Sequence, residues 1–417
     1  MDTCALTAEY NPFHRGHQEQ LRLLGQHFGK KAGLILCLSG PFCQRGVPAL
    51  LDKRVRAGLA LAMGADLVLE LPVAFAAASA ERFAQGAIQT LLATGVVRHL
   101  AYGSEAPDQG DKIKELAAFL AHEPQALGQA IRQGIADGLG FAASRQKAVT
   151  ELTQDPLMGQ LLSQSNTILA LEYEKALVRY GPLPSLALPL FDKERHSASA
   201  IRDRVWEAVQ SDQKEALWQL LTDLAPLLPP PSSAAIMDAL IQGKGLVLEE
   251  DLAPFLLRSP RFRNRESLEE IAGMQAGLAN RVFNALKDDP ARALSEGPRP
   301  YEAFINGLAT RAHPASRIRR AILAAALGIR KQDRALTQAG PGYIRVLGFS
   351  RQGRRLLSYM RREASLPVIM QASDFRQLKD ETALAQASLD LQAQALWQLH
   401  AGQAGTSQFQ DRPIQVP

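Results

Sequence analysis

A run of seven uncharged residues, 32 to 38, constrains the fold of this chain more than any other feature. Its sequence, Ala-Gly-Leu-Ile-Leu-Cys-Leu, does not alternate polar with apolar residues. Such a run is typical of a strand buried on both faces, as in a parallel sheet that helices cover on both sides. The turn signal Ser39-Gly40-Pro41 follows it directly. We therefore expect a central strand here.

Similar apolar runs alternate with helical patterns over the first two hundred residues. Further strands are expected at residues 4–8, 67–71, 99–102 and 186–190. Asp52 and Ser79 are expected to cap helices that Gly64 and Gly95 end, and a later helix opens with Ser165 or Asn166 at its cap. This alternation predicts an α/β fold with a Rossmann-like parallel sheet. We place this domain at residues 1–205 and a mostly helical domain at residues 206–417.

The second half of the chain carries the positive charge. Residues 301 to 362 contain thirteen lysines and arginines but only two acidic residues, in a chain whose net charge is +5. A charge run is usually a solvated face, yet an excess this large favours a polyanion-binding surface. Two helices are expected to present it, and the candidate contacts are Arg317, Arg319, Arg320, Arg354 and Arg355.

The composition is typical of a globular protein without a membrane span. Hydrophobic residues make up 46% of the 417 residues and charged residues 21%, as in a globular protein. No basic segment followed by a long apolar segment opens the chain, and Asp66, Glu70 and Pro72 interrupt its most apolar stretch. Three cysteines without metal-ligand spacing fit a reducing compartment. We therefore expect a cytoplasmic protein without a membrane span, an obligate protein partner or a protein-held metal.

The motif His14-Arg15-Gly16-His17 lies between the expected strand at residues 4–8 and the helix that follows. A helix N-terminus offers free backbone N–H groups and a positive dipole end to an anion. The two histidines add directed donors, and the glycine leaves room for a nucleotide beside the backbone. The motif therefore suits a triphosphate whose α-phosphorus is stabilised while pyrophosphate leaves. Phe13, just before it, is more simply explained as a core residue.

Three polar clusters follow predicted strands, at residues 11–17, 39–46 and 103–105. In parallel sheets, ligands bind at the carboxyl ends of the strands, near the point where the strand order reverses. The three clusters therefore predict one site. The segment Ser197-Ala198-Ser199-Ala200-Ile201-Arg202, at an expected helix start, is a further arrangement that favours phosphate.

Each of these residues also has a simpler interpretation. Gly40, Pro41 and Gly46 could only shape a loop, and Asn166 could only cap its helix. For Gly103, a plain turn and a close approach to a nucleotide ring are equally compatible with the sequence.

The motifs together resemble those of the bacterial tRNA(Met) cytidine acetate ligases, a family of the HIGH-type nucleotidyltransferase-like superfamily. The resemblance spans nearly the whole chain, and its N-terminal block is the most specific part. The matching segments are Ala8-Glu9-Tyr10-Asn11-Pro12-Phe13-His14 with Gly16-His17, Ser39-Gly40 with Phe42, Gln44-Arg45-Gly46, Pro48-Ala49, Asp52-Lys53, Asp66-Leu67-Val68, Glu70-Leu71-Pro72, Gly103-Ser104-Glu105, Asn166 with Ile168-Leu169, Ser197 to Arg202, Arg317 to Ala321 and Tyr343 to Phe349.

The resemblance implies an ATP-dependent ligase. Such enzymes activate acetate as acetyl-adenylate and then acetylate the wobble cytidine of elongator methionine tRNA, giving N4-acetylcytidine. ATP would be a substrate accompanied by Mg²⁺, His14 and His17 would be catalytic, and the five arginines would contact tRNA. The implied ATP-binding residues are Thr7, Ala8, Glu9, Tyr10, Asn11, Pro12, Phe13, His14, Arg15, Gly16, His17, Gln18, Glu19, Gln20, Gly103 and Asn166.

One segment departs from the family's pattern. The family has an arginine-led Arg-x-Gly-Ala-x-Tyr-His-like segment before the Ser-Ala-x-Ala-Ile-Arg motif, and here residues 191–196 replace it in a contracted form. We expect Arg195 to take over the ATP contact of that arginine, with Lys193 as the alternative.

Two other functions fit parts of the chain. A small-molecule adenylyltransferase would use the same N-terminal site but would leave the arginine-rich half without a role. An RNA-binding protein with an inert nucleotide site would use only that half. Acetate-dependent pyrophosphate exchange separates the ligase from both.

Overall fold

The structure is a computed structural model, and it describes the chain except for residues 1, 30, 192–196, 212–213, 260–261, 263, 276, 288–296, 334 and 404–410. Its strands are β1 (Thr3–Ala8), β2 (Gly33–Ser39), β3 (Leu67–Leu71), β4 (His99–Ser104), β5 (Ser185–Pro189), β6 (Ile344–Phe349), β7 (Val368–Ile369) and β8 (Ile414–Gln415).

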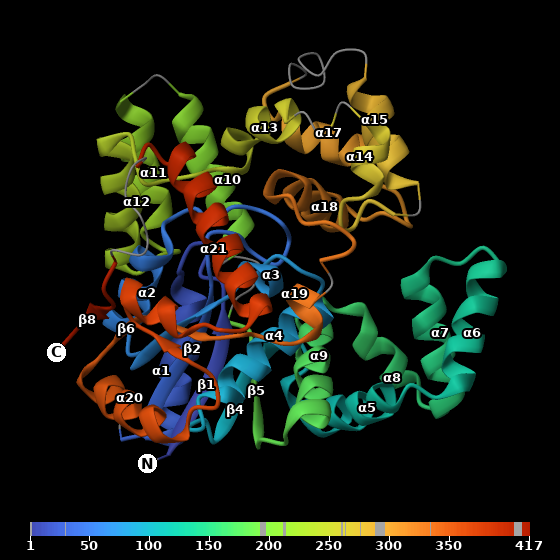
Figure 1. The fold of residues 1–417 in the computed structure, drawn as a ribbon, viewed down its shortest axis with the longest axis horizontal. Coiled ribbons are helices and arrows are strands. Elements are labelled where there is room, and N and C mark those ends of the chain that lie inside the picture. The colour runs from blue at the N-terminus through green and yellow to red at the C-terminus, as the bar shows by residue number, and fades with distance from the viewer. Residues whose placement is uncertain are drawn as a thin grey trace.

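The described helices surround these strands (Figure 1). In the first half they are α1 (Arg15–Phe28), α2 (Lys53–Ala62), α3 (Val73–Ala76), α4 (Ala80–Ala93), α5 (Gly110–His122), α6 (Gln125–Ala136), α7 (Phe141–Thr153), α8 (Pro156–Gln160), α9 (Ser165–Tyr180) and α10 (Ala198–Gln210). In the second half they are α11 (Lys214–Leu224), α12 (Pro230–Gln242), α13 (Glu249–Arg258), α14 (Arg265–Glu269), α15 (Leu278–Leu286), α17 (Pro300–Leu308), α18 (Ala315–Leu327), α19 (Ala335–Gln338), α20 (Arg351–Glu363) and α21 (Glu381–His400).

The strands form one sheet in the order β5-β4-β1-β2-β3-β6-β7, and β8 pairs with β6. The five strands from β5 to β3 are mutually parallel, as the uncharged runs predicted. The chain moves from β1 outward to β3 and then returns to place β4 on the other side of β1. The strand order therefore reverses between β1 and β4, where a ligand site is expected.

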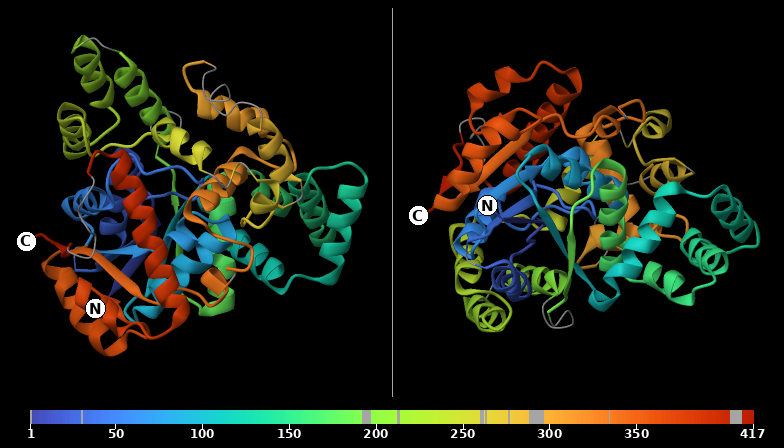
Figure 2. Two further views of the ribbon diagram at one scale, coloured as in Figure 1. Left: turned by 45° about the horizontal axis from the view of Figure 1, so that its top comes forward. Right: turned by 90° about the horizontal axis from the view of Figure 1, so that it is seen from below.

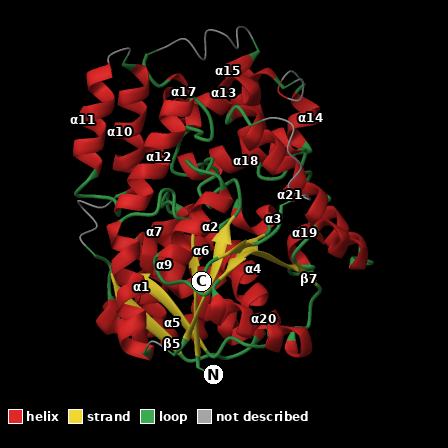
Figure 3. Ribbon diagram, turned by 90° about the vertical axis from the view of Figure 1, so that its left-hand side faces the viewer, coloured by secondary structure: helices red, strands yellow, loops and turns green. Residues whose placement is uncertain are grey.

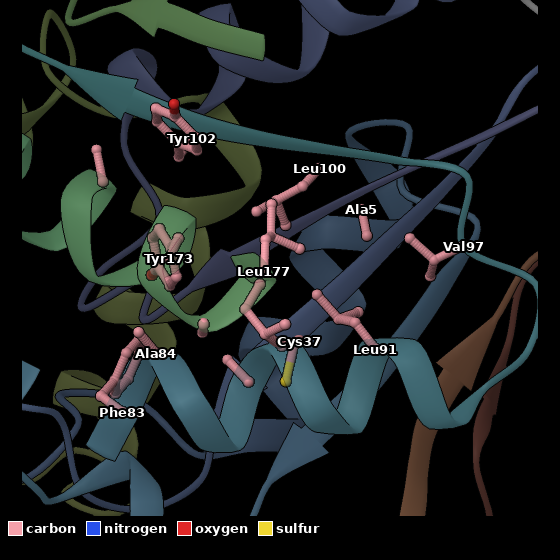
Figure 4. Close-up of a cluster of buried hydrophobic side chains, with 14 of the residues drawn as sticks. Ala5, Cys37, Phe83, Ala84, Leu91, Val97, Leu100, Tyr102, Tyr173 and Leu177 are labelled. Carbon is pink, nitrogen blue, oxygen red and sulfur yellow. The ribbon is translucent and has the colours of Figure 1, made fainter. Parts of the chain in front are cut away.

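Helices cover both faces of the sheet, which confirms the predicted α/β class. On one face, α4 and α9 pack against the central strands around a buried apolar cluster (Figure 4). On the other face, Leu21 and Leu24 of α1 and Ala57 and Ala60 of α2 belong to a second cluster. The side chains labelled in Figure 4 belong to the first of these two clusters, the one between the sheet and helices α4 and α9: Ala5, Cys37, Phe83, Ala84, Leu91, Val97, Leu100, Tyr102, Tyr173 and Leu177.

Most helices between α10 and α18 lie over one end of the sheet (Figure 3). That end carries the carboxyl termini of the parallel strands, because the N-terminus that leads into β1 lies at the other end (Figure 3). The hairpin of α6 and α7 projects away from the sheet, and the two chain termini lie near each other (Figure 2). The helical region therefore covers the end of the sheet where the ligand site is expected.

The sheet also includes strands from the last quarter of the chain, which the sequence analysis did not predict. β6 pairs antiparallel with β3, and β7 and β8 pair with β6. Buried charges join these strands, since Glu70 of β3 lies 2.6 Å from Lys53 Nζ and 3.4 Å from Arg345 Nε of β6. The domain division at residue 205 stays a prediction, because the second half both adds to the sheet and forms its own helical core.

Capping residues were predicted for three helices, and the prediction is correct for two of them. Asp52 accepts a hydrogen bond from Arg54 N at 2.7 Å, and Ser79 accepts one from Arg82 N at 3.4 Å. The expectation that Ser165 or Asn166 caps α9 is wrong, because Gln164 occupies that position. The carboxylate of Glu105 accepts the backbone N–H groups of Asn166 and Thr167 instead.

Within the described residues, no helix is long and apolar enough to cross a membrane. Cys4, Cys37 and Cys43 are buried and form no disulfide.

Arg56 is fully buried and holds the loops at the carboxyl end of the sheet together. Its guanidinium donates to the carbonyl oxygens of Glu9 at 2.7 Å and Ser39 at 2.9 Å, which follow or end β1 and β2. It also donates to the carbonyls of Gly40 and Leu51. One side chain thus satisfies four carbonyl groups that burial would otherwise leave without partners.

We predict that Arg56→Met lowers the free energy of unfolding by about 3 kcal/mol or more, because removing a buried charged partner leaves these carbonyls unsatisfied. Urea denaturation measures this change. Arg54→Met is the control, since Arg54 lies on the same helix but is partly exposed and should change stability by less than about 1 kcal/mol. Equal losses in the two variants would contradict the role of Arg56.

Candidate active site

The loop between β1 and α1 forms the floor of the site. Tyr10 and Phe13 are buried, and their rings meet edge-to-face at 4.7 Å between centroids. Phe13 is fully buried, so the structure supports its simpler interpretation as a core residue. His14 then caps α1, and its Nδ1 accepts a hydrogen bond from Gly16 N at 3.1 Å.

Gly16 leaves room for the His14 ring rather than for an empty space. A Cβ atom at Gly16 would lie 2.9 Å from His14 Cε1, closer than such atoms approach in proteins. The ring of His14 therefore lies directly over the first turn of α1. The motif predicted that a nucleotide would occupy this space, and in the structure the His14 ring takes part of it.

The backbone N–H groups that begin α1 already have protein partners, which corrects the expectation that they are free. Arg15 N donates to Leu227 O at 2.9 Å, and Gly16 N donates to His14. His17 N donates to His14 O at 2.9 Å. Recognition of an anion at this loop therefore falls mainly to side chains.

The rings of His14 and His17 are stacked, with their centroids 3.7 Å apart. His17 Nδ1 accepts a hydrogen bond from His14 N at 3.2 Å. The Nδ1 atoms of both rings thus accept backbone N–H groups, so the neutral form of each ring carries its hydrogen on Nε2. Burial, and then the nearby His14, hold the pKa of His17 well below its usual range. His17 is accordingly a neutral donor at physiological pH.

A cavity of about 310 Å³ opens beside these histidines. Arg45 from the loop after β2 and Arg202 from α10 bring positive charge to its wall. Ser197, Ala198 and Ser199 at the start of α10 also line it, so this helix N-terminus faces the cavity. Two histidine donors, two arginines and a helix dipole make this space suitable for phosphate groups.

A second cavity of about 690 Å³ adjoins the first. Both are lined by Glu9, His17, Gln20, Arg45 and Asn166, so they are two parts of one cleft. The second part extends to Gly103 of β4, and the aromatic residues Phe83, Tyr102 and Tyr173 line it. Its aromatic wall suits a nucleobase.

Polar residues behind the cleft fix its shape. Asn11 donates to Pro48 O at 3.1 Å and accepts from Leu50 N at 2.7 Å, which ties the β1 loop to the β2 loop. Arg202 donates to Asn11 O at 2.7 Å. Glu9 accepts a hydrogen bond from Gln44 N at 2.6 Å, and burial raises the pKa of its carboxyl group.

Gly46 does more than shape a loop. Its φ of 79° is in the left-handed region, and a Cβ atom there would lie 2.6 Å from Arg320 N. The β2 loop and helix α18 therefore approach each other backbone to backbone. Gly103 lies inside β4, so the plain-turn interpretation is wrong, and it lines the second cavity.

The structure brings most of the predicted ATP-binding residues to this cleft. Those that line it are Thr7, Ala8, Glu9, Tyr10, Asn11, His14, Gly16, His17, Gln20, Gly103 and Asn166. Those that do not line it are Pro12, Phe13, Arg15, Gln18 and Glu19. Asn166 does not cap α9, and its side chain donates to Glu105 at 2.9 Å. Arg195 and its alternative Lys193 lie outside the described residues.

The five candidate RNA-binding arginines fall into two groups at opposite ends of the sheet (Figure 1). Arg317, Arg319 and Arg320 lie on α18, beside the cleft. Arg354 and Arg355 lie on α20, which follows the end of β6 next to the start of β3. Arg319 forms an ion pair with Glu249, as an arginine with a structural role would.

Comparison with known proteins assigns the chain to a family. A family model described as HIGH Nucleotidyl Transferase matches residues 1–412. A tRNA(Met) cytidine acetate ligase of Acetivibrio thermocellus is 30% identical over 417 residues, covering 95% of this chain and 94% of the relative. The corresponding Thermotoga petrophila protein is 33% identical over 393 residues, covering 90% and 88%. The chain belongs to the HIGH nucleotidyltransferase family. The resemblance drawn from the motifs is thus confirmed.

A solved structure of the same family superimposes on the whole chain. It is a crystal structure of Thermotoga maritima TmcAL bound with alpha-thio ATP, with a TM-score of 0.87, 31% identity and full coverage of both chains. The fold predicted from the sequence is confirmed by this similarity.

Two arginines of the cleft were absent from the predicted ATP-binding residues. Arg45 is part of the Gln-Arg-Gly motif after β2, and Arg202 ends the segment at residues 197–202 that was recognised as favourable for phosphate. Both signals were present in the sequence, but only the fold shows that the two side chains reach the same cavity as the histidines.

The low pKa of His17 predicts a pH effect on stability. The unfolded chain binds a proton at His17 below about pH 6.5, whereas the folded chain resists this protonation. Stability should therefore fall with decreasing pH below this value, and His17→Asn should remove part of that fall, because Asn can still accept the N–H of His14.

Melting temperatures from pH 7.5 to 5 for the parent, His17→Asn and the exposed control His27→Asn measure this effect. The parent and the control should destabilise in parallel, and His17→Asn should fall less. A His17→Asn curve parallel to that of the parent would show that His17 has no such depressed pKa.

Proposed function

We propose that this chain is a tRNA(Met) cytidine acetate ligase, which uses ATP and acetate to convert the wobble cytidine of elongator methionine tRNA to N4-acetylcytidine. The relatives that share its whole length carry this name, and the similar crystal structure holds an ATP analogue. The single observation that carries the proposal is the two-part cleft, in which a cationic cavity adjoins an aromatic one at the point where the strand order reverses.

The first half-reaction would take place in the cationic cavity. An acetate oxygen attacks the α-phosphorus of ATP, the bond to the bridging oxygen of pyrophosphate breaks, and acetyl-adenylate and pyrophosphate result. Negative charge grows on the phosphoryl oxygens and on the leaving group. The side chains of His14, His17, Arg45 and Arg202 line this cavity and would stabilise that charge.

The aromatic cavity would hold the adenosine part of ATP near Gly103 and Asn166. In the second half-reaction the exocyclic amine of cytidine attacks the acetyl carbonyl carbon, AMP leaves with the electron pair of the broken C–O bond, and the amine loses a proton. The adjoining cavities allow both reactants to meet in one cleft.

Magnesium would enter with the triphosphate. Among the described residues, no group of three or more His, Cys, Asp or Glu side chains is placed to hold a metal ion, so no step is assigned to a protein-held metal. Because tRNA is the proposed substrate, the cytoplasm remains the expected compartment.

Mass analysis of tRNA nucleosides tests the proposal. Purified protein incubated with ATP, acetate and elongator methionine tRNA should produce N4-acetylcytidine, and omission of either ATP or acetate should abolish it. Acetate-independent nucleotidyl transfer to a small molecule would instead favour an adenylyltransferase. Tight tRNA binding without any adenylate would favour an RNA-binding protein.

We predict that His17→Ala lowers the rate of acetate-dependent ATP–pyrophosphate exchange by about 100-fold, because its donor meets charge that develops mainly in the transition state. ATP affinity should change by less than about tenfold, since the ground-state phosphates keep Arg45 and Arg202. His14→Ala should change both quantities in the same direction.

His27→Ala is the matched control, because His27 lies on the same helix but is exposed and outside the cleft. It should exchange pyrophosphate as the parent does. A His17→Ala protein that exchanges pyrophosphate at nearly the parental rate would leave His17 with only a structural role at the start of α1.

A further inference from the structure

A separate cavity of about 490 Å³ is lined by five cationic side chains together with small and apolar residues. We call it the basic cavity and define it by its five cations and its one acid. They are Arg82 of α4, Arg317 and Arg320 of α18, Arg330 and Lys331 after α18, and Asp333.

The protein balances little of the positive charge of the basic cavity, where Asp333 is the lining acid and Glu81 interacts electrostatically with Arg82. Within the part of the chain that the structure describes, none of its five cations forms an ion pair. Arg317 and Arg320 each donate to a neutral carbonyl oxygen, those of Ala312 at 3.1 Å and Gln44 at 3.2 Å. Arg82 donates to the neutral side chain of Gln85 at 2.9 Å. Arg319, on the same helix, instead faces the carboxylate of Glu249.

The single acid offers little compensation. Asp333 Oδ2 accepts the backbone N–H of Arg330 at 2.7 Å, so the carboxylate is engaged in a turn. Like charges also face each other, since burial, and then the neighbouring Arg317, lower the pKa of Arg320. Cations gathered from three chain segments with few counter-charges are typical of a site for a polyanion.

The basic cavity and the nucleotide cleft share two helices as walls. On α4, Phe83 lines the cleft, whereas Arg82 lines the basic cavity. On α18, Arg319 lines the cleft, whereas Arg317 and Arg320 line the basic cavity. A helix is about 10 Å in diameter, so the two spaces lie within about one helix diameter of each other. Figure 1 shows α18 above α4.

This arrangement fits a polynucleotide better than a free ion. A nucleotide held in the cleft is joined to neighbours whose phosphate groups lie within such a distance along the strand. We propose that the basic cavity binds the phosphate backbone of tRNA beside the cytidine that enters the cleft, an inference that rests on the proposed function. The arginines of α20 lie at the other end of the sheet and take no part in this contact.

The paired substitution Arg82→Gln with Lys331→Gln tests the inference. It should weaken binding of elongator methionine tRNA about tenfold at 0.1 M salt and make the plot of log K against log salt less steep by about two, as expected for two lost phosphate contacts. Acetate-dependent pyrophosphate exchange, which needs no RNA, should remain at the parental rate. Acetylation at low tRNA concentration should fall with binding.

The control is Arg351→Gln with Arg361→Gln, which removes the same charge from exposed positions on α20. It should bind tRNA as the parent does. If Arg82→Gln disturbs folding in a thermal melt, Arg330→Gln with Lys331→Gln replaces it, because Arg330 is exposed. Equal weakening in the α20 control, or parental tRNA binding by both cavity variants, would overturn the inference.

A small-anion site is distinguished by tripolyphosphate titration with the cleft saturated by ATP. Tight tripolyphosphate binding that the cavity variant loses, with tRNA binding unchanged, would also overturn the inference. The proposed function fails separately, if the parent forms no N4-acetylcytidine, whatever the cavity variants do to tRNA binding.

Discussion

The buried guanidinium of Arg56 is the contact on which the rest of the site depends. It donates hydrogen bonds to carbonyl oxygens at the ends of β1 and β2 and in the loop that leads into α2. Loop carbonyls without such partners would carry a large free-energy cost inside the protein. By holding these loops closed, Arg56 lets Asn11 bridge them and lets α18 approach Gly46. The cleft lies between the surfaces that this contact brings together.

This scaffold transfers anion recognition from backbone to side chains. The backbone N–H groups at the start of α1 donate to His14 and to the carbonyl of Leu227, and those at the start of α9 donate to Glu105. The starts of α10 and α18 also line the cleft. At the α1 loop itself, the neutral, stacked histidines and the two arginines are the side-chain donors beside the cavity.

Much of the fold could be predicted because its parallel strands are apolar and its helix caps are local. Residues 32–38, Asp52 and Ser79 each specify their element through neighbours in sequence. The sheet's extension could not be predicted in this way, because β3 and β6 are joined through the buried charges of Glu70 and Arg345, which in a sequence suggest exposure. The carboxylate that accepts the first N–H groups of α9 is that of Glu105, 62 residues before Thr167, and a local rule could not find it.

In the proposed reaction, one cleft first joins acetate to AMP and then gives the acetyl group to cytidine. Acetate labelled with heavy oxygen in both positions tests this claim directly when the products made with ATP and tRNA are weighed by mass spectrometry. The attacking oxygen stays with the α-phosphorus when the C–O bond breaks, so AMP should gain one heavy oxygen and N4-acetylcytidine should keep the other. Unlabelled AMP, with the heavy oxygen found in inorganic phosphate, would contradict the claim.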